Sequence, residues 1–204
     1  VPPMVAEGRQ VLRNVQRVAK LFVTKSVLAA FLILTLGTSS TAYPLLPRHF
    51  SLVAALTIGI PAFFLALAPS TGRWRPEGFL RDIARFTVPA GLAAGAGVLA
   101  GYLLALHGLD ESVRQSRTVA TAILMVLGLR FVIALEGARG ARGAAVWLLC
   151  AVMAGLYALA VGIPEVRCFF ELSAPQPELW LCAGVGIAVG LVAFRIGSRL
   201  ARTS

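Results

Sequence analysis

The sequence predicts an all-α membrane protein, a polytopic bundle of six transmembrane helices whose first helix extends into the cytoplasm as a stalk. Apolar residues make up 58% of the 204 residues and charged residues only 14%, against about 45–50% and about 25% in soluble domains. The mean hydropathy is +0.82, which excludes disorder, and 3 Cys are too few for a disulfide scaffold. Six stretches approach the length of about 20 residues that a helix needs to cross a bilayer.

The first three predicted spans cover residues 21–37, 51–69 and 86–106. The first (LFVTKSVLAAFLILTLG) is apolar apart from a short polar group that contains Lys25. The second (SLVAALTIGIPAFFLALAP) is interrupted by Pro61. The third carries small residues at intervals of four, a pattern that predicts close packing between helices: Gly91, Gly95, Gly97 and Gly101.

The last three predicted spans cover residues 118–135, 144–163 and 178–194. The fourth and fifth are almost continuous runs of aliphatic residues and alanine. The sixth repeats the small-residue spacing with Gly186 and Gly190. Short connections separate all six spans, as expected for an antiparallel bundle.

A polar helix is predicted to lead into the first span without a break. The segment VAEGRQVLRNVQRVAK (residues 5–20) places apolar residues on one face and arginines on another, and no proline separates it from the span. We expect a helix of about 30 residues and about 45 Å, with residues 1–20 forming a cytoplasmic stalk. The stalk could lie on anionic headgroups or act as a lever for a cytoplasmic domain that precedes Val1.

The distribution of charge predicts the side of the membrane that each loop occupies. The chain has 19 Lys and Arg against 9 Asp and Glu, a net charge of +10. An even number of spans puts both termini on one side, and most basic residues flank that side. Lys and Arg favour the cytoplasmic face, so we expect a multi-pass plasma-membrane protein with both termini in the cytoplasm. This asymmetry explains the charge without nucleic acid, and the bilayer is the predicted partner.

No motif for catalysis or for a structural metal site is present. Cys150 and Cys182 fall inside predicted spans, and Cys168 has no second loop cysteine to pair with. We expect Glu136, at the end of the fourth span, to be solvated. The longest loop, residues 165–177, is expected to contribute no chemistry.

Three stretches resemble P-type cation-transporting ATPases. The run EGRQVLRNVQRVAKLFVTKS resembles the segment after the phosphorylation domain, where a Gly-Arg pair and then an Asn open the stalk of the fifth membrane helix. Gly8, Arg9 and Asn14 match that pattern. The run GIPAFFLALAPS resembles the sixth membrane helix, and RPEGFLRDIARF resembles the cytoplasmic loop that follows it. On this resemblance the chain corresponds to helices five to ten, and it is most similar to the mycobacterial calcium-transporting subgroup.

The resemblance implies a membrane-domain fragment of an ATP-driven transporter of cations such as calcium. ATP and Mg²⁺ would be used by cytoplasmic domains that precede Val1, and these and the earlier membrane helices would be partners of the chain. The sequence contains neither the Asp-Lys-Thr-Gly-Thr phosphorylation motif nor a Gly-rich nucleotide loop. Alone, the chain is expected to be inactive. The alternative is a self-contained six-span secondary transporter, channel or membrane scaffold.

Thr24, Lys25 and Ser26 are candidate ion-pathway residues in the first span. A lysine inside a span is costly unless it snorkels or finds a partner. The resemblance offers a third role, a fixed positive charge that occupies or repels an ion site. The two hydroxyls either bond to carbonyls of their own helix or serve as neutral ligands, which suit a hard cation only weakly.

Thr57, Gly59 and Pro61 are the candidate residues in the second span. Pro61 has no N–H and crowds the carbonyl of Thr57, so we expect the helix to open there. Freed carbonyls that line a cavity can coordinate ions, and Gly59 permits close approach. A simple kink that shapes packing is the alternative.

The sequence departs from the family at the carboxylates. Well-understood calcium and sodium pumps carry an Asn and a Glu in the fifth helix, and an Asn and an Asp in the sixth. The matching positions here are Ser26, Ala29, Ala54 and Ile58. Calcium as the cargo is therefore implied by the resemblance and not by these residues, so the ligands of the ion stay unknown.

Overall fold

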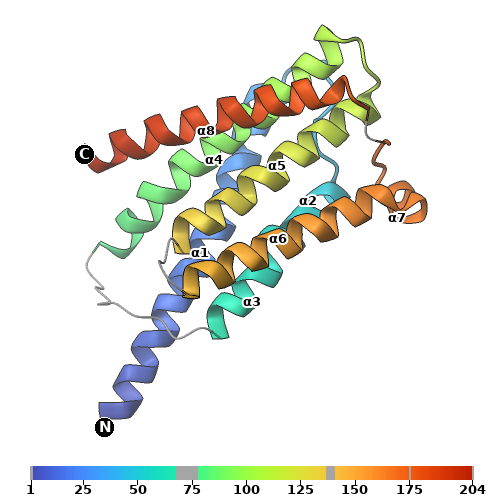
Figure 1. Cartoon of the computed structure of the whole chain (residues 1–204). Coiled ribbons are helices and arrows are strands. Elements are labelled where there is room, and N and C mark those ends of the chain that lie inside the picture. Colours follow the sequence, from blue (N-terminus) through green and yellow to red (C-terminus); the bar gives the residue numbers. More distant parts are fainter. Residues whose placement is uncertain (1, 68–77, 137–140, 175, 204) are drawn as a thin grey trace.

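The computed structural model describes residues 2–67, 78–136, 141–174 and 176–203. These residues contain no strand, so the all-α prediction is confirmed. The helices, drawn in Figure 1, are α1 (Pro2–Leu36), α2 (Pro47–Ala54), the π-helical turn η1 (Ala55–Gly59), α3 (Ile60–Leu67), α4 (Phe79–Leu103), the π-helical turn η2 (Leu104–Gly108), α5 (Val113–Glu136), α6 (Ala141–Gly162), α7 (Pro164–Phe169) and α8 (Leu179–Thr203).

Six helical stretches of the described chain are long and apolar enough to cross a membrane. They are Asn14–Leu36, Pro47–Phe64, Phe79–Gly108, Val113–Glu136, Gly143–Gly162 and Leu179–Ala201. Each overlaps one predicted span. Most extend further than predicted, because the helices continue into polar residues at their ends, which hydropathy alone does not count as part of a span.

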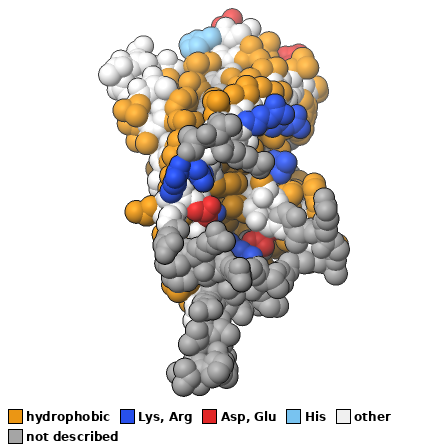
Figure 2. Space-filling view, turned by 90° about the vertical axis from the view of Figure 1, so that its left-hand side faces the viewer, with side chains coloured by type: hydrophobic (Ala, Val, Ile, Leu, Met, Phe, Trp, Pro, Cys, Tyr) orange, Lys and Arg blue, Asp and Glu red, His pale blue; other side chains and the backbone are white. Residues whose placement is uncertain are grey.

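Both termini lie at one end of the bundle (Figure 1), as an even number of spans requires. We call this the terminal end, and the opposite end, with residues 37–46 and α7, the loop end. Figure 2 shows a face on which Lys and Arg side chains lie between hydrophobic ones. The ion pairs of Arg17 with Glu136 and of Lys20 with Asp82 belong to the terminal end.

α4 is the centre of the bundle and packs against α1, α5 and α8. Its contact with α8 depends on glycine: a Cβ on Gly97 would lie 2.6 Å from the carbonyl oxygen of Gly186, and a Cβ on Gly186 would meet the carbonyl oxygen of Gly97. The two backbones therefore touch, as the small-residue pattern predicted. Leu127 of α5 covers Gly190 on the same side of α8.

The predicted helix through the stalk into the first span is unbroken. α1 has 35 residues, which corresponds to about 52 Å at 1.5 Å per residue. Its N-terminal part extends beyond the other helices in Figure 1.

The expectation that Glu136 is solvated was wrong. Its side chain is only 4% exposed, and Oε1 lies 3.3 Å from Nε of Arg17 on α1. α1 covers the last turn of α5, so the carboxylate is buried and its charge is balanced across the helix interface. Sequence reasoning placed Glu136 correctly at a helix end but had no means of knowing which helix would cover that end.

Candidate ion pathway

The second span contains a π-helical turn at the point where the sequence predicted an opening. Within η1 the N–H of Ile60 donates to the carbonyl oxygen of Ala55, five residues back. Pro61, the second residue after the turn, is buried. A proline ring crowds the carbonyl four residues before it, and the wider turn relieves that crowding at Thr57. The opening is thus an extra residue in the turn and not an unwound segment.

A cavity of about 40 Å³ lies between α1 and this turn. Thr24 and Lys25 border it from α1, and Thr57 borders it from η1. The other lining side chains are apolar and come from α1, α2, η1, α4 and α5. The structure therefore brings together three of the six predicted pathway residues, from two spans that are adjacent in the chain.

The other three predicted pathway residues do not line this cavity. Ser26 is exposed on another face of α1, and Gly59 is exposed at the end of the π-turn. Pro61 is buried just beyond the turn. Its effect on the cavity is indirect, through the backbone of the residues before it.

Lys25 is the only charged side chain on the cavity wall. Its Nζ lies 5.5 Å from the centre of the Phe50 ring on α2. A cation held over an aromatic face gains about 0.5–2 kcal/mol, more when water is excluded. The ammonium group of Lys25 therefore contacts the second span through the ring of Phe50. No sequence motif indicated this partner.

The hydroxyl groups bond within their own helices, one of the two expected outcomes. Thr24 Oγ1 donates to the carbonyl oxygen of Lys20 at 2.7 Å, and Thr57 Oγ1 donates to that of Val53 at 2.8 Å. Because each proton is used in this way, the lone pairs of both oxygens can still accept a hydrogen bond or contact a cation. Ser26 Oγ makes a longer bond of the same kind, 3.3 Å to Phe22.

Gly128 of α5 was missed by sequence reasoning. A Cβ at this position would lie 2.8 Å from Thr57 Cγ2 and 3.1 Å from Thr57 Oγ1. The missing side chain thus gives Thr57 its space beside the cavity. A single glycine in an apolar helix carries no signal that would have identified this contact.

The predicted stalk residues lie in the N-terminal half of α1. Gly8 is exposed, and a Cβ there would meet no atom within 4 Å. Asn14 is buried, with 8% of its surface exposed. The side chain of Arg9 lies outside the described part of the structure. A coupling role for the three residues therefore stays a prediction.

Polar contacts hold α1 where it meets the bundle. Lys20 Nζ and Gln16 Nε2 each lie 2.8 Å from Oδ2 of Asp82, at the start of α4. Arg17, which lies between Gln16 and Lys20 in the sequence, pairs with Glu136 at the end of α5. α1 is therefore tied to two helices at one level.

No carboxylate reaches the cavity. Its lining contains neither Asp nor Glu. Among the described residues there is also no group of three or more His, Cys, Asp or Glu that could hold a metal ion. The available oxygens are hydroxyls and carbonyls, and the positive charge of Lys25 stands beside them.

No family model matches the sequence. The chain is 35% identical over 204 residues to the calcium-transporting ATPase CtpE of Mycobacterium bovis, and equally to that of Mycobacterium tuberculosis, with 94% of this chain covered. It is 32% identical over 201 residues to CtpE of Mycolicibacterium smegmatis. In each case the chain spans 25% of the length of the relative. The chain is therefore homologous to the C-terminal membrane region of calcium-transporting P-type ATPases.

Proposed function

We propose that the chain forms part of the ion pathway of an ATP-driven cation transporter. The observation that carries this proposal is the cavity between Lys25 and Thr24 on α1 and Thr57 on the π-turn. It lies beside a helix that runs unbroken from Pro2 to Leu36. A movement imposed on the exposed part of α1 would reach the cavity wall through a continuous rod.

We propose that this rod couples the pathway to cytoplasmic ATPase domains in another part of the same protein. Gly8, Arg9 and Asn14 would receive the movement at the stalk. Those domains would bind ATP and Mg²⁺, and the energy of phosphoryl transfer would tilt α1 against the π-turn. Ion access would then alternate between the two faces of the membrane.

The same proposal states where the chain lies and which parts of the cell and of the protein surround it. The bilayer encloses the six spans, and both termini lie in the cytoplasm, because the basic residues gather at the terminal end. The earlier membrane helices of the parent protein complete the bundle. We propose the plasma membrane as the location.

The transported ion is proposed to be a cation, with calcium suggested by the names of the relatives. Calcium prefers several oxygen ligands that include carboxylates. Thr24 and Thr57 offer only neutral oxygens, and the carbonyls near Gly59 and Pro61 lie further along the second span. The carboxylates would therefore come from helices outside this chain.

The test is transport by the full-length protein in inside-out vesicles. We expect ATP-dependent uptake of radioactive calcium and calcium-stimulated ATP hydrolysis. Lys25→Met keeps an unbranched side chain and removes the positive charge from the cavity. Like charges repel strongly in such a site, so we expect the apparent affinity for the cation to rise at least about tenfold, the equivalent of about 1.4 kcal/mol.

Ser26→Ala is the matched control, because Ser26 is adjacent to Lys25 but exposed on another face. It should leave the affinity unchanged. If the wild type and Lys25→Met had equal apparent affinities for the cation, Lys25 would not be part of the ion pathway. Cation flux that needs no ATP would instead favour the self-contained transporter or channel.

A further inference from the structure

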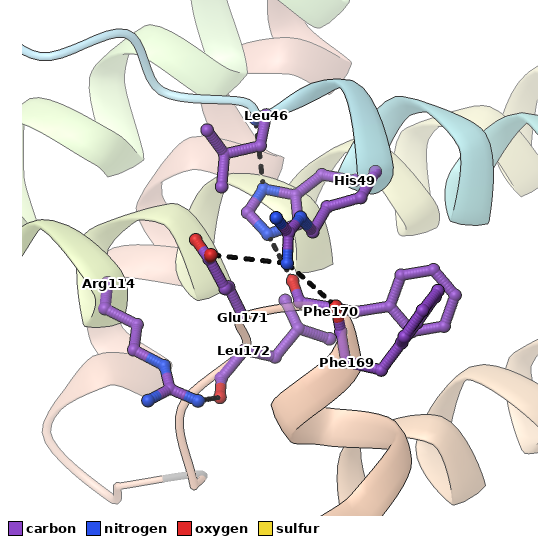
Figure 3. Close-up of polar contacts among 8 residues, drawn as sticks. Leu46, His49, Arg114, Phe169, Phe170, Glu171 and Leu172 are labelled. Carbon is purple, nitrogen blue, oxygen red and sulfur yellow. Dashed lines mark hydrogen bonds and ion pairs between the residues drawn. The ribbon is translucent and has the colours of Figure 1, made fainter.

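At the loop end of the bundle, the start of the second span is hydrogen-bonded to residues 169–170, which lie more than 100 residues away in the sequence. His49, at the start of α2, is fully buried. Its Nδ1 accepts from the N–H of Leu46 at 3.2 Å, so the proton is on Nε2, which donates to the carbonyl oxygen of Phe170 at 2.8 Å. Both ring nitrogens are thus used, one at the N-cap residue of α2 and one across to the loop after α7 (Figure 3).

Arg48 adds two contacts to the same loop. Its Nη1 donates to the carbonyl oxygen of Phe169 at 2.9 Å and lies 3.2 Å from Oε1 of Glu171. We call Arg48, His49 and the loop residues 169–172 the latch. Three of its contacts join positions more than 120 residues apart in the chain.

The loop is in turn fastened to α5. Arg114 Nη2 donates to the carbonyl oxygen of Leu172 at 2.9 Å, and the N–H of Ser173 donates to Thr118 Oγ1 at 2.8 Å. The side chain of Leu172 is fully buried beneath these bonds. Through the loop, the latch therefore fixes α2 to α5.

The segment that precedes α2 is held as well. Arg117 Nε of α5 donates to the carbonyl oxygen of Tyr43 at 3.0 Å, and the hydroxyl of Tyr102 on α4 donates to that of Ala42 at 2.6 Å. The segment that leads into α2 is thus held by α4 and α5, while the first turn of α2 is held by the loop after α7. Most of these bonds use backbone carbonyls, whose position is set by the chain path.

The part of the span beyond the π-turn has no polar side chain that could form such bonds. α3 consists of the residues IPAFFLAL, so every one of its side chains is apolar. Phe63 and Phe64 are 62% and 52% exposed. Apolar contacts can slide past one another without breaking directed bonds. Between α2, which polar contacts hold, and α3, whose side chains are all apolar, lies η1, where the hydrogen-bond pattern already departs from the α-helix.

We propose that the latch makes η1 a hinge, with α2 stationary and α3 the moving part of the second span. This inference rests on the proposed function for its movement, since it states which half of the span responds when α1 tilts. The fixed half carries Phe50, the partner of Lys25, so the aromatic side of the cavity stays in place while the other side of the π-turn shifts.

The latch itself is tested by hydrogen–deuterium exchange of the full-length protein in nanodiscs. In His49→Ala, the amides of residues 47–54 and of 168–173 should exchange faster together, by roughly tenfold, because each segment loses its bonds to the other. Arg48→Met is a milder variant, and it should also raise the exchange rates of both segments together. Ser51→Ala is the control, because Ser51 is exposed and bonds only to the carbonyl oxygen of Pro47. Faster exchange in one segment alone would contradict the proposal that the latch holds the two segments together.

The hinge is tested by distances between spin labels. The native Cys168 is exposed and is paired with Ser51→Cys on α2 or with Phe64→Cys on α3, with the other cysteines replaced. Between the calcium-loaded state and a phosphate-analogue state, the first distance should stay constant and the second should change. Equal changes in both, or no change in either while ATP drives transport, would refute the hinge. A protein without ATPase activity would refute the proposed function instead, and the exchange experiment would still decide the latch.

Discussion

Replacing Gly128 by alanine tests whether α5 positions Thr57 beside the cavity. The added Cβ would lie 2.8 Å from Thr57 Cγ2, whereas carbon atoms pack best at about 3.5–4.0 Å. Thr57 or α5 must therefore move by roughly 0.7–1.2 Å. Overpacking of this kind costs about 1–3 kcal/mol, and here it also shifts the π-turn, which is bonded through Thr57 to Val53.

We expect Gly128→Ala to lower the thermal unfolding midpoint of the full-length protein and to reduce cation-stimulated ATP hydrolysis. Gly155→Ala is the control, because a Cβ there meets no atom within 4 Å; it should be neutral or stabilising by up to about 1 kcal/mol. Thr57→Ser removes the methyl group that makes the closest contact, so the double variant should recover part of the lost stability. The reasoning fails if Gly128→Ala is as stable and active as Gly155→Ala, or if Thr57→Ser gives no recovery.

The remaining predictions concern the stalk contacts and the interrupted helix. Arg17→Ala leaves Glu136, 4% exposed, without its cation, and should cost up to about 3–5 kcal/mol; Asp82→Asn removes a pair whose carboxylate is 59% exposed and should cost about 0–1 kcal/mol. Thermal unfolding of both variants checks this, and equal losses would contradict the assigned burial. Pro61→Ala restores an N–H and should let the π-turn revert to α-helix, which rotates Thr57 by about 100° relative to α3. In Pro61→Ala, membrane insertion should be normal and ATP-driven cation uptake impaired. Normal uptake would show that transport does not depend on the π-turn.

The helices and the break at Pro61 follow from local features of the sequence, which is why they could be predicted. Hydropathy depends on the residues of one span, and the effect of proline extends only four residues back. The unbroken α1 is predictable for the same reason, since no residue between Val5 and Leu36 interrupts its pattern. Helix limits were less accurate, because polar residues continue a helix beyond the apolar core.

The cavity was predictable only in part. Thr24, Lys25 and Thr57 are polar residues inside apolar spans and therefore stood out. Phe50 and Gly128 complete the wall, but an aromatic and a glycine are ordinary residues in membrane helices. Their importance arises from the packing of α2 and α5 against α1, which depends on all the helices together.

The polar contacts at the two ends of the bundle could not be predicted. Glu136 was misjudged because its burial depends on where α1 crosses α5. In the latch, four residues of one loop contribute mainly carbonyl oxygens, which every residue type possesses. A sequence pattern cannot identify an acceptor of that kind.

The position of the ion pairs along α1 has a mechanical consequence. Gln16, Arg17 and Lys20 are held by neighbouring helices, so in the proposed movement of α1 they would act as the fulcrum. From residue 18 the N-terminal arm to Pro2 measures about 24 Å and the arm to Lys25 about 10 Å. A swing of the outer end would arrive at the ammonium reduced to less than half its amplitude and with correspondingly greater force. In the proposed mechanism, a large movement of a cytoplasmic domain would thereby become a movement of a few ångströms at the ion.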